Sequence, residues 1–244
     1  MDVWGLTDPG KVRKQNQDSF HTERLGDDCL LAVVCDGMGG AKAGNVASRL
    51  ATDVFTEEIK RNFSPDKTPS EVERVLRNAV TLANISVFEH SQLSEEFSGM
   101  GTTLVACLIY PRAVLVINVG DSRAYHFSSD GVECVTTDHS VVEMMVRRGE
   151  LTPEEAKTHP SKNLITRAVG TAAQVEADVF RVKPLKNDCI LLCSDGLSNM
   201  MADQEMLFEV AHGAKKDDCC QRLLEIAKDR GAPDNVTAVL IWLT

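Results

Sequence analysis

The strongest constraint on the fold is a two-residue connection between two apolar runs. The runs are residues 101–110 (GTTLVACLIY) and 113–121 (AVLVINVGD), and only Pro111 and Arg112 separate them. Two residues can join antiparallel strands, whereas parallel strands need a crossover of a dozen residues or more. The sequence therefore predicts antiparallel sheet and argues against a regular parallel α/β fold.

Other strand-like runs are spread along the chain. They are DVWGLTD from residue 2, CLLAVVCD from residue 29, CILLCSDG from residue 189 and NVTAVLIWL from residue 235. Residues 122–137 carry two alternating runs around an Asp-Gly turn, which is a good β-hairpin signal.

Amphipathic helices are expected between these runs. Residues 43–62 form one, and a second is predicted to begin at Ser70, which forms a capping box with Glu73. A short helix is expected from a box at residues 152–155, and another at residues 217–230. The order of elements predicts one α+β domain over residues 1–244, with antiparallel sheets flanked by helices.

Composition excludes several classes of partner. The net charge is -10, from 36 acidic and 26 basic residues without a Lys/Arg block, so nucleic acid is not expected as a partner. No apolar stretch is long enough to span a membrane and no signal peptide is evident, so we expect a cytoplasmic protein. The eight cysteines lie mostly in apolar runs without a C-x-x-C pair, which predicts buried thiols rather than zinc ligands or disulfides.

A glycine turn follows the run at residues 30–40 (LLAVVCDGMGG). The dinucleotide fingerprint fails there because Lys42 stands where its third glycine is required. The Walker A pattern fails because Asn45 and Val46 replace its Lys and Ser/Thr. A structural turn is therefore favoured over a phosphate cradle.

Aspartates mark the ends of the apolar runs. Three runs end on Asp36, Asp121 and Asp195, and Asp234 precedes the last run. One such Asp can simply cap a turn, but several at one sheet edge would repel one another unless a cation lay among them. Oxygen ligands without His or Cys suit Mg²⁺ or Mn²⁺, and two such ions can activate a water for hydrolysis. Arg13, five residues before Asp18, could hold a phosphoryl group in its planar fork.

Seven motifs then stand in an order that resembles a known family. They are TDPGKVRKQNQD, VVCDGMGG, SGMGTTLVA, NVGDSR, TTDHS, LLCSDGL and PDNVTAVLI. Together they resemble the metal-dependent protein phosphatases, the type 2C serine/threonine class, in their bacterial signalling form. The resemblance covers the whole chain and implies a four-layer αββα sandwich of two antiparallel sheets, each covered by a helix pair.

The resemblance also implies the site. The implied metal ligands are Asp18, Asp36, Gly37 through its carbonyl, Asp121, Asp195 and Asp234. In the family, the residue matched by Asp36 bridges two ions, and the one matched by Asp121 can help hold a third. Arg13 matches the phosphate-binding residue. The implied reaction is direct in-line hydrolysis of phosphoserine and phosphothreonine in proteins by a water held between the ions. The implied partners are phosphorylated proteins and a serine/threonine kinase, and a monomer is expected.

Two departures and one insertion leave questions open. Many bacterial relatives have His where this chain has Ala41, so the leaving-group acid is either His139 or a water. Some relatives have an acidic residue where this chain has Asn199, which would weaken a third ion site. Residues 141–168 match the family's flap, whose Arg147, Arg148 and Lys162 could meet acidic phosphopeptides or form an ordinary solvated face.

Two other functions share parts of this pattern. A catalytically idle binding module would keep the fold, but all the expected carboxylates are present, which favours catalysis. A two-metal phosphodiesterase or nuclease would fit the carboxylates but not the acidic net charge.

Overall fold

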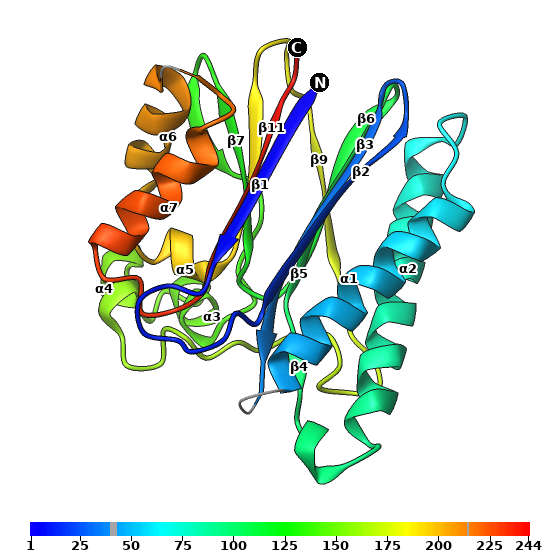
Figure 1. Cartoon of the computed structure of the whole chain (residues 1–244), viewed down its shortest axis with the longest axis vertical. Coiled ribbons are helices and arrows are strands. Elements are labelled where there is room, and N and C mark those ends of the chain that lie inside the picture. Colours follow the sequence, from blue (N-terminus) through cyan, green and yellow to red (C-terminus); the bar gives the residue numbers. More distant parts are fainter. Residues whose placement is uncertain (40–42, 214) are drawn as a thin grey trace.

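Two antiparallel β-sheets face each other and helices cover both outer sides (Figure 1). The computed structural model describes residues 1–39, 43–213 and 215–244. On one side the pair α1 and α2 packs on the larger sheet, and on the other α6 and α7 pack on the smaller one. The predicted αββα sandwich is confirmed.

Eleven strands in the described chain form the sheets. The first sheet has the order β1 (Asp2–Asp8), β11 (Val236–Trp242), β10 (Cys189–Cys193), β7 (Arg123–Ser128) and β8 (Gly131–Cys134). The second has the order β2 (Asp18–Gly26), β3 (Cys29–Met38), β5 (Leu104–Tyr110), β6 (Ala113–Val119) and β9 (Asp178–Val182), and the short β4 (Gly101–Thr102) pairs with β3.

Both predicted hairpins are confirmed. Tyr110 of β5 pairs with Ala113 of β6 across the two-residue turn, and Ser128 of β7 pairs with Gly131 of β8. Strands β2 and β9 were not predicted. They are the two edge strands of the second sheet, and most of their residues are only partly buried.

The apolar strands are buried on both faces. In β3, Leu31, Val33 and Cys35 belong to the core under the helices α1 and α2. The alternate residues Leu30, Ala32 and Val34 belong to the core between the two sheets. This is why the strand is a continuous apolar run rather than an alternating one, since residues i and i+2 share a face.

The four helices predicted by residue range are present in the described chain, in the expected order, together with others that the sequence analysis did not place. They are α1 (Ala43–Asn62), α2 (Pro69–Ser91), a 3₁₀ turn (Glu95–Phe97), α3 (Val141–Arg147), α4 (Pro153–Thr158), α5 (Asp195–Ser198), α6 (Asp203–His212) and α7 (Cys219–Asp229). The box at Thr152 and Glu155 is confirmed. The predicted start of α2 at Ser70 was wrong, because the capping box uses Thr68 and Glu71 and places Pro69 in the first turn.

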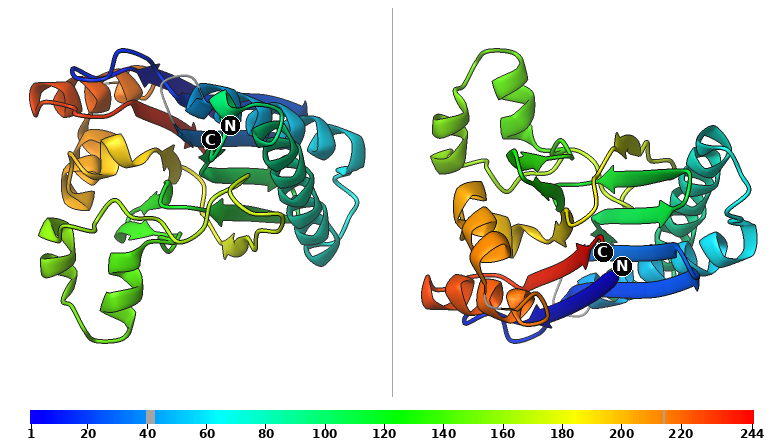
Figure 2. Two further views of the ribbon diagram at one scale, coloured as in Figure 1. Left: turned by 90° about the horizontal axis from the view of Figure 1, so that it is seen from below. Right: turned by 90° about the horizontal axis from the view of Figure 1, so that it is seen from above.

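The segment that contains α3 and α4 projects away from the sandwich (Figure 2). Its base is a short pairing of Ser140 with Ile165. We call residues 141–168 the flap. The base of the flap lies beside the turn after β6, since His139 N donates to the Gly120 carbonyl at 2.9 Å and Thr166 N donates to the His139 carbonyl at 2.7 Å.

The cysteines are free thiols, and all but Cys134 are buried. This confirms the prediction of buried small apolar side chains. Among the described residues, no helix is long and apolar enough to cross a membrane.

Candidate metal centre and active site

Five aspartates meet at one edge of the sandwich. Asp18 begins β2 and pairs directly with Asp36 of β3 in the sheet register. Asp121 follows β6, Asp195 follows β10 and opens α5, and Asp234 precedes β11. Burial raises the pKa of Asp36 well above its usual range, and the charges of the other four carboxylates raise it further. The structure therefore brings together the side chains that sequence reasoning selected.

Asp18 is the most deeply buried of the five, with 6% of its surface exposed. Its Oδ2 accepts hydrogen bonds from the hydroxyls of Ser194, at 2.7 Å, and Thr237, at 2.6 Å. Burial raises the pKa of Asp18 to about 6 against the effect of these hydroxyls. Its buried Oδ1 has no partner among the described residues, which is costly unless a cation or a water completes it.

The backbone of Asp36 is fixed by Thr103. Asp36 N donates to Thr103 Oγ1 at 2.9 Å, Thr103 N donates to the Asp36 carbonyl at 2.9 Å, and the Thr103 hydroxyl bonds that of Ser122 at 2.7 Å. These bonds set the carboxylate at the end of the strand. Because Ser122 follows Asp121, the same chain of bonds joins the ends of β3 and β6.

Gly37 lies where backbone segments pack closely. A Cβ at this position would lie 2.1 Å from the carbonyl oxygen of Gly44 and 2.6 Å from that of Gln17. No side chain fits there, so the glycine lets α1 begin directly against the end of β3. Ala41 and Lys42, which bear on the open question of the leaving-group acid, lie outside the described residues.

Asp121 and Asp195 form the other side of the cluster. Burial raises the pKa of Asp121 to about 7, and the charges of Asp195 and Asp138 add to it. Burial, followed by the charge of Asp234, also raises the pKa of Asp195. Asn199 donates its amide to Asp195 Oδ2 at 3.0 Å, so this position braces Asp195 instead of adding another carboxylate.

Arg13 lies beside the cluster on the loop between β1 and β2. Its Nη2 donates to Asp234 Oδ2 at 2.7 Å, and about half of the Arg13 side chain is exposed. The hydrogen bond and charge of Asp234, with the charges of Asp36 and Asp195, raise the pKa of Arg13 against desolvation. The predicted phosphate-binding cation thus faces the carboxylates.

Asn235 fixes the Arg13 loop and was missed by sequence reasoning. Its Oδ1 accepts from Gln17 N at 2.8 Å, and its Nδ2 donates to the carbonyls of Pro9 and Gln15, each at 3.0 Å. The sequence signal was its position next to Asp234. Sequence reasoning also missed three hydroxyls that support the aspartates. They belong to Thr103, which bonds the Asp36 backbone, and to Ser194 and Thr237, which bond Asp18.

His139 is buried rather than open to a substrate, with 7% of its surface exposed. Its Nδ1 accepts from Gly120 N at 3.0 Å, and its Nε2 lies 3.2 Å from Asp178 Oδ2. Both ring nitrogens are therefore engaged by groups other than the five clustered aspartates. Of the flap cations, Arg147 pairs with Glu143 at 3.1 Å and Lys162 is exposed.

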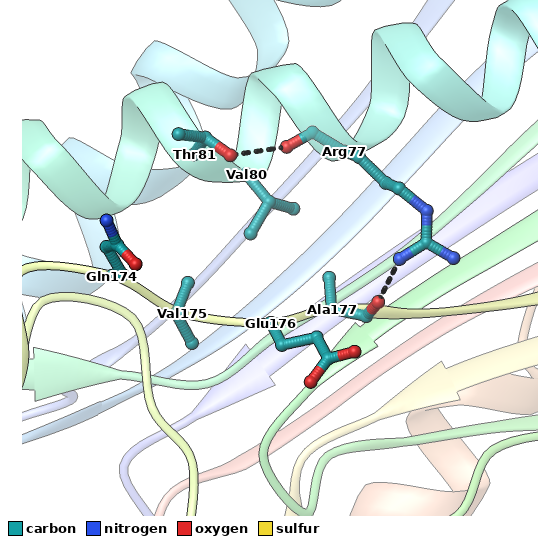
Figure 3. A pocket seen from close by; sticks show the side chains of 7 residues that line it. All are labelled: Arg77, Val80, Thr81, Gln174, Val175, Glu176 and Ala177. Atoms are coloured by element: carbon teal, nitrogen blue, oxygen red, sulfur yellow. Dashed lines mark hydrogen bonds between the residues drawn. The ribbon is translucent and has the colours of Figure 1, made fainter.

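A cavity of about 440 Å³ lies elsewhere, between α2 and the segment before β9 (Figure 3). Its lining includes Arg77, Thr81, Gln174 and Glu176, and none of the predicted site residues. The candidate site is thus an open sheet edge rather than this cavity.

The donor set fits divalent cations. In the described part of the chain, no three His, Cys, Asp or Glu side chains already form a group that could hold an ion. The charges of the other four carboxylates nevertheless raise the pKa of Asp36, and the buried Asp18 Oδ1 lacks a partner among the described residues. Mg²⁺ and similar ions keep several waters and need only one or two carboxylates each, so these residues suit hydrated oxygen-bound ions better than a closed cage.

Carboxylates grouped at a sheet edge are typical of hydrolases that use divalent ions. A family model described as protein phosphatase 2C matches residues 11–240. The chain belongs to the protein phosphatase 2C family.

Known relatives span nearly the whole chain. The serine/threonine phosphatase stp of Listeria monocytogenes is 35% identical over 235 residues, which cover 96% of this chain and 93% of the relative. The solved Streptococcus agalactiae serine/threonine phosphatase superposes with a TM-score of 0.93 at 32% identity and covers 100% of this chain and 99% of its own. The catalytic domain of the phosphatase PstP, solved with two manganese ions, gives 0.81 at 29% identity, covering 98% of this chain and 96% of its own.

Proposed function

We propose that the chain is a metal-dependent protein serine/threonine phosphatase that hydrolyses phosphoserine and phosphothreonine. The observation that carries this proposal is the convergence of five strand-end aspartates beside Arg13 at one sheet edge. The family membership and the named activities of its relatives support it.

The proposed ligands follow the residues at that edge. Asp36, the Gly37 carbonyl, Asp195 and Asp234 would hold two ions, and Asp18 would act directly or through water. Asp121 would help Asp195 to hold a third ion. When bound, these ions supply a water of lowered pKa as nucleophile and positive charge for the phosphoryl oxygens.

The chain's own side chains orient the substrate. Arg13 binds the phosphate oxygens with its planar fork, and the Asn235 bonds hold the Arg13 loop in place. The chain has no cysteine followed by five residues and an arginine, the arrangement of phosphatases that use a thiolate, and burial raises the pKa of Cys35, the cysteine next to Asp36, to about 12. The proposed reaction is therefore direct hydrolysis without a cysteinyl phosphate.

The finer features of this function are also part of the proposal. The ions are Mg²⁺ or Mn²⁺, because the donors are oxygens only. The enzyme opposes a serine/threonine kinase as a cytoplasmic signalling monomer, and its single domain carries both the active site and the flap. The net charge of -10 supports protein rather than nucleic-acid substrates.

Hydrolysis of a phosphothreonine peptide tests the proposal. We expect the wild type to release phosphate with Mn²⁺ or Mg²⁺ and to stop when EDTA is added. Asp195→Ala should be inactive with every metal. An inactive wild type with each of these metals would instead identify a binding module that keeps the family fold.

Arg13→Ala is expected to raise KM for the phosphopeptide about 10-fold, because a charge-assisted hydrogen bond is worth roughly 1.5 kcal/mol or more. The Mn²⁺ affinity should not weaken, since the variant removes a cation from Asp234. Steady-state kinetics and Mn²⁺ titration calorimetry measure the two effects. Lys14→Ala, in the same exposed loop, is the matched control and should change KM less than about 2-fold. An unchanged KM in Arg13→Ala would remove Arg13 from the substrate site.

A further inference from the structure

His139 holds the turn that carries Asp121. His139 N donates to the Gly120 carbonyl at 2.9 Å, and Gly120 N donates back to the ring Nδ1 at 3.0 Å. A buried N–H that lost its acceptor would be left unsatisfied, which destabilises a fold. The ring is therefore the acceptor that fixes Gly120, the residue directly before Asp121.

The turn itself has little freedom to adopt another shape. Gly120 has a φ of +107°, in the region that favours glycine, and a Cβ there would lie 2.6 Å from the Thr103 side chain. Asn118 Nδ2 also donates to the Gly120 carbonyl at 3.2 Å. Any shift of Gly120 would carry the Asp121 carboxylate with it.

The opposite side of the ring is tied to the base of the flap. Because Nδ1 accepts a hydrogen bond, the ring proton lies on Nε2, which donates to Asp178 Oδ2 at 3.2 Å and also lies 3.3 Å from Arg167 Nη1. Arg167, at the end of the flap, donates to Asp178 Oδ1 at 3.1 Å. Thr166 N donates to the His139 carbonyl at 2.7 Å. The ring is thus clamped from the flap side while it supports the turn.

We propose that His139 is a positioning residue that sets the Asp121 carboxylate for metal binding, and that Asp178 and Arg167 hold its ring from the base of the flap. The inference rests on the proposed function, in which Asp121 is a metal ligand. It replaces the sequence-based hypothesis that His139 donates a proton to the leaving group. The ring contacts neither substrate nor ion in this role.

Two amide substitutions separate the two sides of the ring. In His139→Asn the side-chain oxygen can take the place of Nδ1 and accept from Gly120, whereas the link to Asp178 is lost. In His139→Gln the amide reaches the place of Nε2, and Gly120 N loses its acceptor. Mn²⁺ binding to each protein is measured from the electron paramagnetic resonance signal of free Mn²⁺, which does not depend on turnover.

We expect His139→Gln to weaken binding of the third Mn²⁺ ion, the one that Asp121 would help to hold, about 10-fold, as is typical when a residue that orients a metal ligand is lost. His139→Asn should stay within about 3-fold of the wild type. In an Asp121→Asn background, His139→Gln should cause no further loss, because it acts through Asp121. Thermal unfolding confirms that each variant is folded.

Three results would overturn the proposal. They are unchanged Mn²⁺ binding in His139→Gln, equal weakening in both amide variants, and a loss that persists in the Asp121→Asn background. The last two would assign the ring to general packing. The proposed function fails separately, through a wild type that releases no phosphate, and the Mn²⁺ binding curves still test His139 in that case.

Discussion

Replacing Asp36 by asparagine is expected to lower kcat at least about 10³-fold while the fold is retained. The charges of all four other aspartates raise the pKa of Asp36, so Asp36 lies at the centre of the cluster. Asparagine keeps the shape of the side chain and the backbone bonds to Thr103, and removes only the charge. Bound divalent ions lower the pKa of water and so supply the nucleophile, so loss of their central ligand removes a large rate factor. Phosphopeptide hydrolysis over a range of Mn²⁺ concentrations measures the loss.

Asp8→Asn is the matched control for this variant. Asp8 also ends a strand at this edge of the sandwich, where it pairs with Val236. Its Oδ2 accepts from Lys228 at 2.7 Å and its Oδ1 from Gly10 N at 2.8 Å, and it lies outside the cluster. Asp8→Asn should keep kcat within about 2-fold. If Asp36→Asn retained more than a tenth of the wild-type kcat, Asp36 would not be the central ligand.

The sheets were predictable where strands are buried on both faces. The strands β3, β5 and β10 are continuous apolar runs because each supplies two cores. The edge strands β2 and β9 are more exposed to solvent. They therefore contain polar residues such as Thr22, Glu23 and Arg181, and no apolar run marked them in the sequence. Burial on both faces, rather than strand formation itself, produced the readable signal.

The start of α2 shows how two local signals can compete. Thr68 and Ser70 are each followed three residues later by a glutamate, so both fit a capping box. The structure uses Thr68 because Pro69 then stands in the first turn, where its missing N–H costs nothing. Attention to Pro69 would have identified the correct box.

The carboxylates of the site were predictable, but their supports were not. An aspartate at the end of an apolar run is unusual and was noticed in each case. Thr103, Ser194 and Thr237 are short polar residues of a common kind, and only the sheet register brings two of these hydroxyls onto Asp18 and the third onto the Asp36 backbone. His139 was noticed, but its buried contacts with Gly120 and Asp178 depend on tertiary structure.

The metal-free protein is expected to lose stability as pH rises from 5 to 8, and Mn²⁺ is expected to remove this loss. Burial raises the pKa of Asp18 to about 6 and that of Asp121 to about 7, against about 3.9 in the unfolded chain. Between these values the folded state holds protons that the unfolded state has released, so the free energy of unfolding falls with rising pH. For Asp18 alone the whole fall, which begins near pH 4, is roughly 3 kcal/mol, and about half of it lies between pH 5 and 8.

Thermal unfolding from pH 5 to 8, in EDTA and in Mn²⁺, measures this effect as the difference between the two Tm curves. The difference should widen with pH, because a bound cation compensates the carboxylates that protons no longer neutralise. Asp18→Asn removes one of these titrations while its side-chain oxygen can still accept from Ser194 and Thr237. Its Tm in EDTA should therefore fall less between pH 5 and 8 than that of the wild type. If the Tm curves in EDTA and in Mn²⁺ ran parallel across this pH range, the ionised carboxylates would not be binding Mn²⁺. That result would contradict the proposed metal centre.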